Sequence, residues 1–146
     1  MTTRRLTGAV LAAALLAGCG QTGSATTRID EAETEIEDLA DAIVEAVSLE
    51  VTSDRPLGSR GRCDLVTGAV GATNDLSRRG PIPEVDDPLG RASAEMVAVG
   101  YELVPSDRPD EVFGRRDGIR ITVAIDRPTG QLAIDAATSC RALPES

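Results

Sequence analysis

EVFGRRDGIRITVAIDRPTGQLAIDAATSC, residues 111 to 140, is the stretch that decides the fold. Asp117-Gly118 and the segment 127–130, Arg-Pro-Thr-Gly, are turn sequences, and they separate three segments in which apolar residues alternate with others. The pattern predicts an antiparallel meander with strands over residues 111–116, 119–126 and 131–140.

The lengths of the two turns predict the register of this meander. A two-residue first loop and a four-residue second loop give the cross-strand pairs Val112–Val123, Gly114–Ile121, Ile125–Leu132, Val123–Ile134 and Ile121–Ala136. All of these residues share one face, because side chains alternate along a strand. The same parity, carried on through Thr138, places Cys140 on the core side.

Residues 29–47 are predicted to form an amphipathic helix. The apolar residues recur along one stripe, from Ile29 through Ile36 and Ile43 to Val47. Thr27 is the expected cap. Six of the nine residues from 30 to 38 are acidic, and such charges are favourable in the first turns of a helix. We interpret the run as a solvated helix face, and a calcium site or an acidic docking strip is the alternative reading.

The middle of the chain is predicted to hold fewer regular elements. Residues 62–67 alternate as in a short strand, and residues 68–87 are expected to be irregular because Pro81 and Pro83 exclude a helix. Asp87-Pro88 opens a second helix that Gly100 closes, and residues 101–104 read as a strand. The predicted fold class is α+β, with two helices packed on one face of an antiparallel sheet of about four to five strands and one disulfide.

The N-terminus carries a specific targeting pattern. Arg4 and Arg5 precede an apolar segment, residues 8–17, which runs into Leu16-Ala17-Gly18-Cys19. This segment resembles a bacterial lipoprotein signal with its lipobox. The resemblance implies that residues 1–18 are removed and that Cys19 carries a diacylglycerol, which anchors the protein on the extracytoplasmic face of the cell membrane. A plain secretory signal or an uncleaved anchor is the alternative.

The lipobox also divides the chain. Residues 19–28 are polar and rich in small side chains, so they are expected to form a flexible tether, and residues 29–146 a single small α+β domain. Removal of the two signal arginines changes the formal charge of −9 to about −11. We expect no nucleic-acid partner, because a phosphate backbone would repel so acidic a body. The expected partners are the lipid bilayer, through the Cys19 acyl anchor, and an envelope protein.

Cys63 and Cys140 remain once Cys19 is committed to lipid. In an oxidising compartment such a pair is expected to form a disulfide. The alternative is a reactive or redox thiol. It has less support, because the two cysteines are far apart in sequence and the chain contains no histidine to lower a thiol pKa.

Composition excludes most catalytic chemistry. The chain contains no histidine and no lysine, so it cannot build Ser-His-Asp, Cys-His or Ser-Lys systems, or a zinc site that needs imidazole. We therefore expect no catalytic site, metal or cofactor. A carboxylate pair of Glu84 with Asp86 or Asp87 is the remaining option for a hydrolase. A carrier that binds an apolar small molecule or lipid between the helices and the sheet is a further alternative.

The outward face of the meander is the predicted binding site. It would carry Phe113, Arg115, Arg120 and Asp135 beside several alanines, a composition that interface hot spots favour. The alternative is a solvated face on which Arg120 pairs diagonally with Asp135 and the loop 105–110 covers Phe113.

The layout as a whole resembles small disulfide-bonded lipoproteins of high-GC Gram-positive bacteria. The resemblance rests on the lipobox, the tether, the acidic helix, the two cysteines and the terminal meander. It implies a non-catalytic protein-binding or accessory role in the cell envelope.

Overall fold

A computed structural model describes residues 27–145 of the chain. Within this range the elements are α1 (Ile29–Val47), β1 (Ser53–Arg55), β2 (Gly61–Asp64), β3 (Val70–Thr73), β4 (Asp75–Pro81), α2 (Pro88–Ala98), β5 (Glu102–Val104), β6 (Glu111–Arg116), β7 (Ile119–Asp126), β8 (Gln131–Thr138) and β9 (Arg141–Ala142). The lipobox with Cys19, and most of the expected tether, lie outside the described residues.

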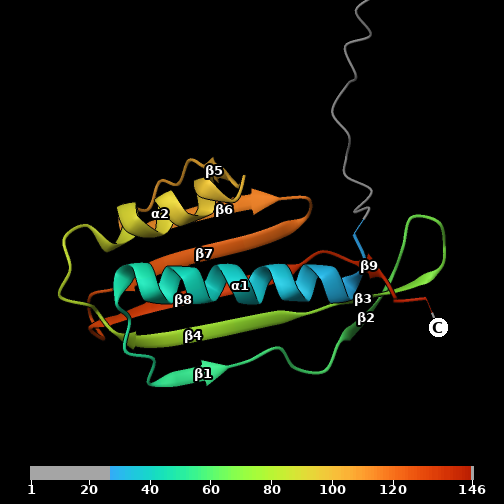
Figure 1. Cartoon of the computed structure of the whole chain (residues 1–146), viewed down its shortest axis with the longest axis horizontal. Coiled ribbons are helices and arrows are strands. Elements are labelled where there is room, and N and C mark those ends of the chain that lie inside the picture. Colours follow the sequence, from blue (N-terminus) through green and yellow to red (C-terminus); the bar gives the residue numbers. More distant parts are fainter. Residues whose placement is uncertain (1–26, 146) are drawn as a thin grey trace, which may run out of the picture.

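The strands form two antiparallel sheets. The large sheet has six strands in the order β1-β4-β8-β7-β6-β5, and the small sheet has three in the order β2-β3-β9. Both helices lie on one face of the large sheet, and the small sheet lies at one end of it (Figure 1). The α+β class with two helices on one sheet face is confirmed, but the expectation of about four to five strands was too low.

The meander has the predicted register. Val112 lies opposite Val123, and Ile121 lies opposite Ala136, as the two loop lengths require. Asp117 and Gly118 have φ angles of 45° and 75°, the left-handed values that a two-residue hairpin loop needs.

The expectation that residues 68–87 are irregular was wrong, because β3 and β4 lie within them. The strand β4 pairs with β8 over its whole length, and its residues Leu76, Arg78 and Gly80 lie opposite core-facing residues of β8. Only one of these three is apolar, so the alternation that marks a half-buried strand is missing from the sequence. The Arg78 guanidinium is neutralised by Asp41 of α1 and by Asp54 of β1, the latter at 3.7 Å.

Both helices occur where the sequence predicts them, with one difference at a cap. Asp87 caps α2, since its Oδ1 accepts a hydrogen bond from the Gly90 amide at 3.0 Å. For α1 the capping residue is Arg28 rather than Thr27, and the Arg28 amide donates to the Glu31 carboxylate at 3.2 Å. The Thr27 hydroxyl instead accepts a hydrogen bond from Arg141.

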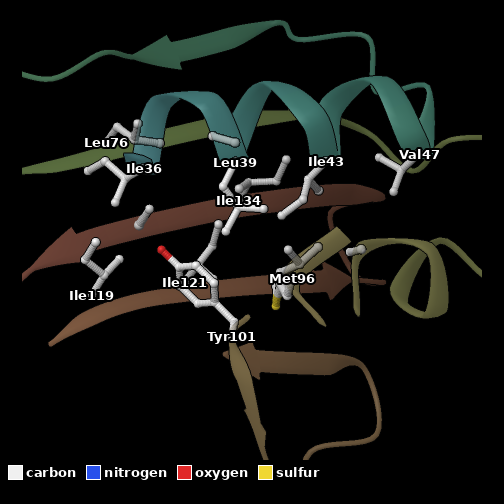
Figure 2. Packing of buried hydrophobic residues seen from close by; sticks show 14 of the residues in the cluster. Ile36, Leu39, Ile43, Val47, Leu76, Met96, Tyr101, Ile119, Ile121 and Ile134 are labelled. Atoms are coloured by element: carbon white, nitrogen blue, oxygen red, sulfur yellow. The ribbon is translucent and has the colours of Figure 1, made fainter. Parts of the chain in front are cut away.

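The core lies between the helices and the large sheet. Figure 2 shows Ile36, Leu39, Ile43 and Val47 directed from α1 toward the strands that carry Ile121 and Ile134. Met96 of α2 and Tyr101 complete the cluster beneath the second helix. These aliphatic side chains fill the space between the layers.

The disulfide joins Cys63 to Cys140, as predicted, across a sequence separation of 77 residues. Its position differs from the expectation, because β8 ends at Thr138 and Cys140 is half-buried beyond it. Thr138 and Asn74 exchange hydrogen bonds at 2.9 Å through their backbones and the Thr138 hydroxyl, and the chain then turns into β9. The disulfide therefore belongs to the small sheet and not to the main core.

Candidate functional site

The candidate site is the outer face of the large sheet, which we define as the face opposite the helices. Side chains alternate along each strand, so the residues between the core positions point to this face. Its centre consists of small residues, namely Ala124, Ala133, Ala137, Thr122 and Ser77. No element within residues 27–145 covers it, because α1 and α2 both pack on the other face.

A hollow of about 200 Å³ lies on the outer face and brings together most of the predicted binding residues. Phe113, Arg120 and Asp135 line it, from three neighbouring strands. The remaining lining residues are Arg55, Asp75, Leu76, Thr122, Ala136 and Ala137. The parity of the meander thus places these three predicted residues at one hollow.

Arg115, the fourth predicted binding residue, is not part of this hollow. Its guanidinium pairs with Glu102 of the edge strand β5 at 3.2 Å. The cross-strand register explains the difference, because Arg115 lies opposite Glu102 on one side and Arg120 on the other. The carboxylate that lies opposite Arg115 is therefore that of Glu102, on the edge strand and away from the hollow.

Several charges on the outer face form pairs. Arg55 pairs with Asp75 at 2.6 Å, and Arg79 lies 4.0 Å from Asp135. The Asp135 carboxylate thus lies beside Arg79 rather than forming the diagonal pair with Arg120. Within residues 27–145, Arg120 makes no hydrogen bond or ion pair, so its guanidinium is open to the hollow.

Phe113 is half-buried between two hollows. On its other side a space of about 290 Å³ is lined by Val104, Pro105 and Ser106, from the end of β5 and the loop after it. The loop 105–110 therefore lies beside the ring and leaves part of it exposed. The ring is fixed by its neighbours and still accessible, which is the usual state of an interface anchor.

Ser77 of β4 lies on the outer face between two charged residues of the neighbouring strands. Its side chain is 5% exposed, and its hydroxyl has no hydrogen-bond partner among the described residues. Ser77 lies opposite Asp135 and Arg55 in the two ladders. Sequence reasoning missed Ser77, Arg55 and Asp75 because β1 and β4 were not foreseen, and their polar, short segments carry no strand signal.

A second polar cluster lies on the helix side. The Tyr101 hydroxyl donates to the Glu35 carboxylate at 3.0 Å, and Arg116 lies 3.8 Å from the same carboxylate. Burial raises the pKa of Tyr101, and the charge of Glu35 raises it further. Glu35 and Arg116 also line a surface hollow of about 380 Å³ at the flank of α1. These contacts hold α1 against the sheet.

The carboxylates considered for catalysis do not form a pocket. Asp87 is occupied as the cap of α2, and Glu84 and Asp86 are exposed in the loop before it. Residues 27–145 bring no group of three His, Cys, Asp or Glu side chains together as metal ligands. Neither α1 nor α2 has the combined length and apolar character of a membrane-spanning helix.

Comparisons with known proteins give no family assignment. The chain matches no protein-family model, and searches of curated proteins and of solved structures returned no match.

Proposed function

We propose that this protein is an extracytoplasmic lipoprotein, anchored through Cys19, that acts as a non-catalytic binding module for an envelope protein. The anchor is supported by the sequence, in which a basic start, an apolar run and a lipobox occur in the required order. The disulfide between Cys63 and Cys140 supports export, because such bonds persist in oxidising compartments.

The observation that carries the binding role is the meeting of Phe113 and Arg120 at one hollow on an uncovered sheet face. Aromatic and arginine side chains supply most binding energy at protein interfaces. The surrounding alanine and threonine side chains are short, so a partner backbone can approach the sheet closely. An unpaired guanidinium favours a carboxylate, and we therefore propose that the bound segment of the partner carries an acidic group at this point.

A carrier role has less support, because aliphatic side chains occupy the space between the helices and the sheet. A hydrolase has less support still, because Glu84 and Asp86 are exposed and Asp87 caps a helix. The hollow of about 380 Å³ at the flank of α1 does not favour an apolar ligand, because acidic side chains and Arg116 line it.

Photo-crosslinking in intact cells tests the binding role. A crosslinking residue at Ala124, on the outer face, should give an adduct that disappears when Arg120→Ala or Phe113→Ala is added. Arg127→Ala is the matched control, since Arg127 is an exposed arginine in the turn after β7 and pairs with Asp110 at 2.8 Å. The control should keep the adduct. An adduct that survives both outer-face substitutions would sink the proposal.

The anchor has a separate test. Membrane-extracted protein should carry the mass of a diacylglycerol on a chain that begins at Cys19, and Cys19→Ala should release the protein into the medium. A wild-type protein that is water-soluble and unmodified would refute the anchor and leave the outer-face test unaffected.

A further inference from the structure

The start of the described chain is fixed to the small sheet. Arg141 lies on β9 and is fully buried, and its guanidinium donates to the Thr27 carbonyl at 3.4 Å and to the Thr27 hydroxyl. The strand β9 pairs in turn with β3, which forms a hairpin with β2. The small sheet and Thr27 therefore lie at the same end of the molecule (Figure 1).

The tip of the β2–β3 hairpin is apolar and exposed. Residues 65–74 contain no charged side chain, although 27% of the chain is charged, and no other uncharged run in residues 27–145 is as long. Val66 is 109% exposed, and Val70 and Leu143 on the same small sheet and its tail are also exposed. Three of the seven exposed large apolar side chains of the described chain thus gather at this end.

The backbone of the tip is largely satisfied by the hairpin itself. The Leu65 amide donates to the Ala69 carbonyl, and the Gly68 amide donates to the Leu65 carbonyl, both at 2.8 Å. The Ala69 amide lies 3.4 Å from the Thr67 hydroxyl. Internal partners of this kind lower the cost of moving a backbone segment out of water. The disulfide at Cys63 holds the base of the hairpin.

The expected tether keeps this end close to the bilayer. Seven residues lie between Cys19 and Thr27, and a flexible chain of that length reaches about 15 Å. An acyl anchor on Cys19 would therefore hold the small sheet near the headgroups. The acidic first turn of α1, with Asp30 and Glu31, begins at this same end, whereas the turn between β7 and β8 lies at the far end of the large sheet (Figure 1).

We propose that the hairpin tip, residues 65–70, is a second and non-covalent contact with the lipid bilayer, with Val66 entering the interface. This inference rests on the proposed lipid anchor at Cys19. A single tether leaves a domain free to turn, whereas a second contact fixes its orientation. The tip would thus determine how the outer face is presented to a partner.

Tryptophan fluorescence tests the contact, because the chain contains no tryptophan. Thr67→Trp places a single reporter at the hairpin tip, and Thr129→Trp is the matched control in the turn between β7 and β8, at the opposite end of the large sheet. Each lipidated protein is extracted from membranes and reconstituted into phosphatidylcholine vesicles that contain brominated lipid. Bromine quenches only a tryptophan that enters the bilayer.

We expect quenching and a shift of the emission to shorter wavelength for Thr67→Trp, and neither effect for Thr129→Trp. Because tryptophan itself favours the membrane interface, Val66→Asp is added to Thr67→Trp, and it should remove the quenching. If neither reporter is quenched in protein that mass analysis shows to be lipidated, the membrane contact is overturned and the anchor is not. The hairpin tip would then be free to bind a protein. Quenching that persists with Val66→Asp would also overturn it. If the measured mass of the protein shows no lipid, both the proposed anchor and this inference are refuted.

Discussion

Arginine has three different roles in this chain, because it is the only basic residue present. Arg78 lies on the helix side of the sheet and is neutralised by two carboxylates. Arg141 is fully buried and donates to carbonyl oxygens of Asp117 and Thr27, so it joins segments of the backbone. Arg120 has no such partner among the described residues and lines the outer-face hollow.

The single tyrosine gives a prediction at this scale. Tyr101 is 3% exposed, and its pKa is raised by burial and by the Glu35 carboxylate. The folded state therefore favours the protonated phenol, and this contribution to stability is fully present below the unfolded pKa of about 10. It is lost as the pH rises from there toward the folded value.

Alkaline titration should therefore show phenolate absorbance only as the protein unfolds, since no other tyrosine contributes. Above pH ~10 the free energy of unfolding should fall more steeply for the wild type than for Tyr101→Phe. A phenolate that titrates near its ordinary pKa in protein with a native circular dichroism spectrum would contradict the buried state.

At this scale the sequence predicted Phe113, Arg120 and Asp135 at one site, because strand parity alone determines which side chains share a face. The partners of these residues could not be predicted. Arg79 lies beside Asp135 only because β4 pairs with β8, and nothing in the sequence near Arg79 indicates that pairing.

Among the elements, those that could be predicted have residues at their ends that mark where they begin or stop. Asp87 and Gly100 delimit α2, and Asp117-Gly118 fixes the register of β6 and β7. The strand β4 has no such signal, since it contains Gly80 and ends in Pro81. Its position depends on pairing with β1 and β8, which are distant in sequence, and the local sequence pattern does not indicate this pairing.

Gly80 shows how close one of those neighbours is. A Cβ atom at this position would run into the carbonyl oxygen of Glu50, in the segment that follows α1, and would lie 3.1 Å from the Leu49 side chain. Gly80→Ala should therefore destabilise the protein by about 1–3 kcal/mol. Gly58→Ala is the control, because open space surrounds that position, and its effect should be about 1 kcal/mol or less. Chemical denaturation measures both, and equal midpoints would contradict the close packing of β4.

For the molecule as a whole, the disulfide ties the hairpin of the small sheet to the segment that follows β8. Cys63 and Cys140 close a span of 77 residues, for which the loss of chain entropy in the unfolded state is worth about 4–5 kcal/mol. The pairing was predictable from the cysteine count and the expected compartment. Its location in a separate small sheet was not, because β9 has only two residues and β3 contains a glycine.

Replacement of both cysteines, Cys63→Ala with Cys140→Ala, should lower the free energy of unfolding by about 4–5 kcal/mol. The double variant avoids a free thiol, and denaturant unfolding under non-reducing conditions gives the comparison. A loss below about 1 kcal/mol would mean that other contacts hold the small sheet in place.

The contact between Thr27 and Arg141 also brings the two ends of the folded domain together, since Arg141 is close to the C-terminus. A short linker could join these ends, and new termini could be opened in the exposed turn at residues 127–130, where circular permutation is best tolerated. Such a permuted chain would keep every strand pair but would begin at the far end of the sheet. The fold itself therefore does not require the chain to start beside the small sheet, whereas the proposed anchor at Cys19 would hold this end of the domain at the membrane. Under the proposed anchor at Cys19, a reporter attached after residue 145 should lie near the bilayer, and one inserted at residues 127–130 should lie away from it.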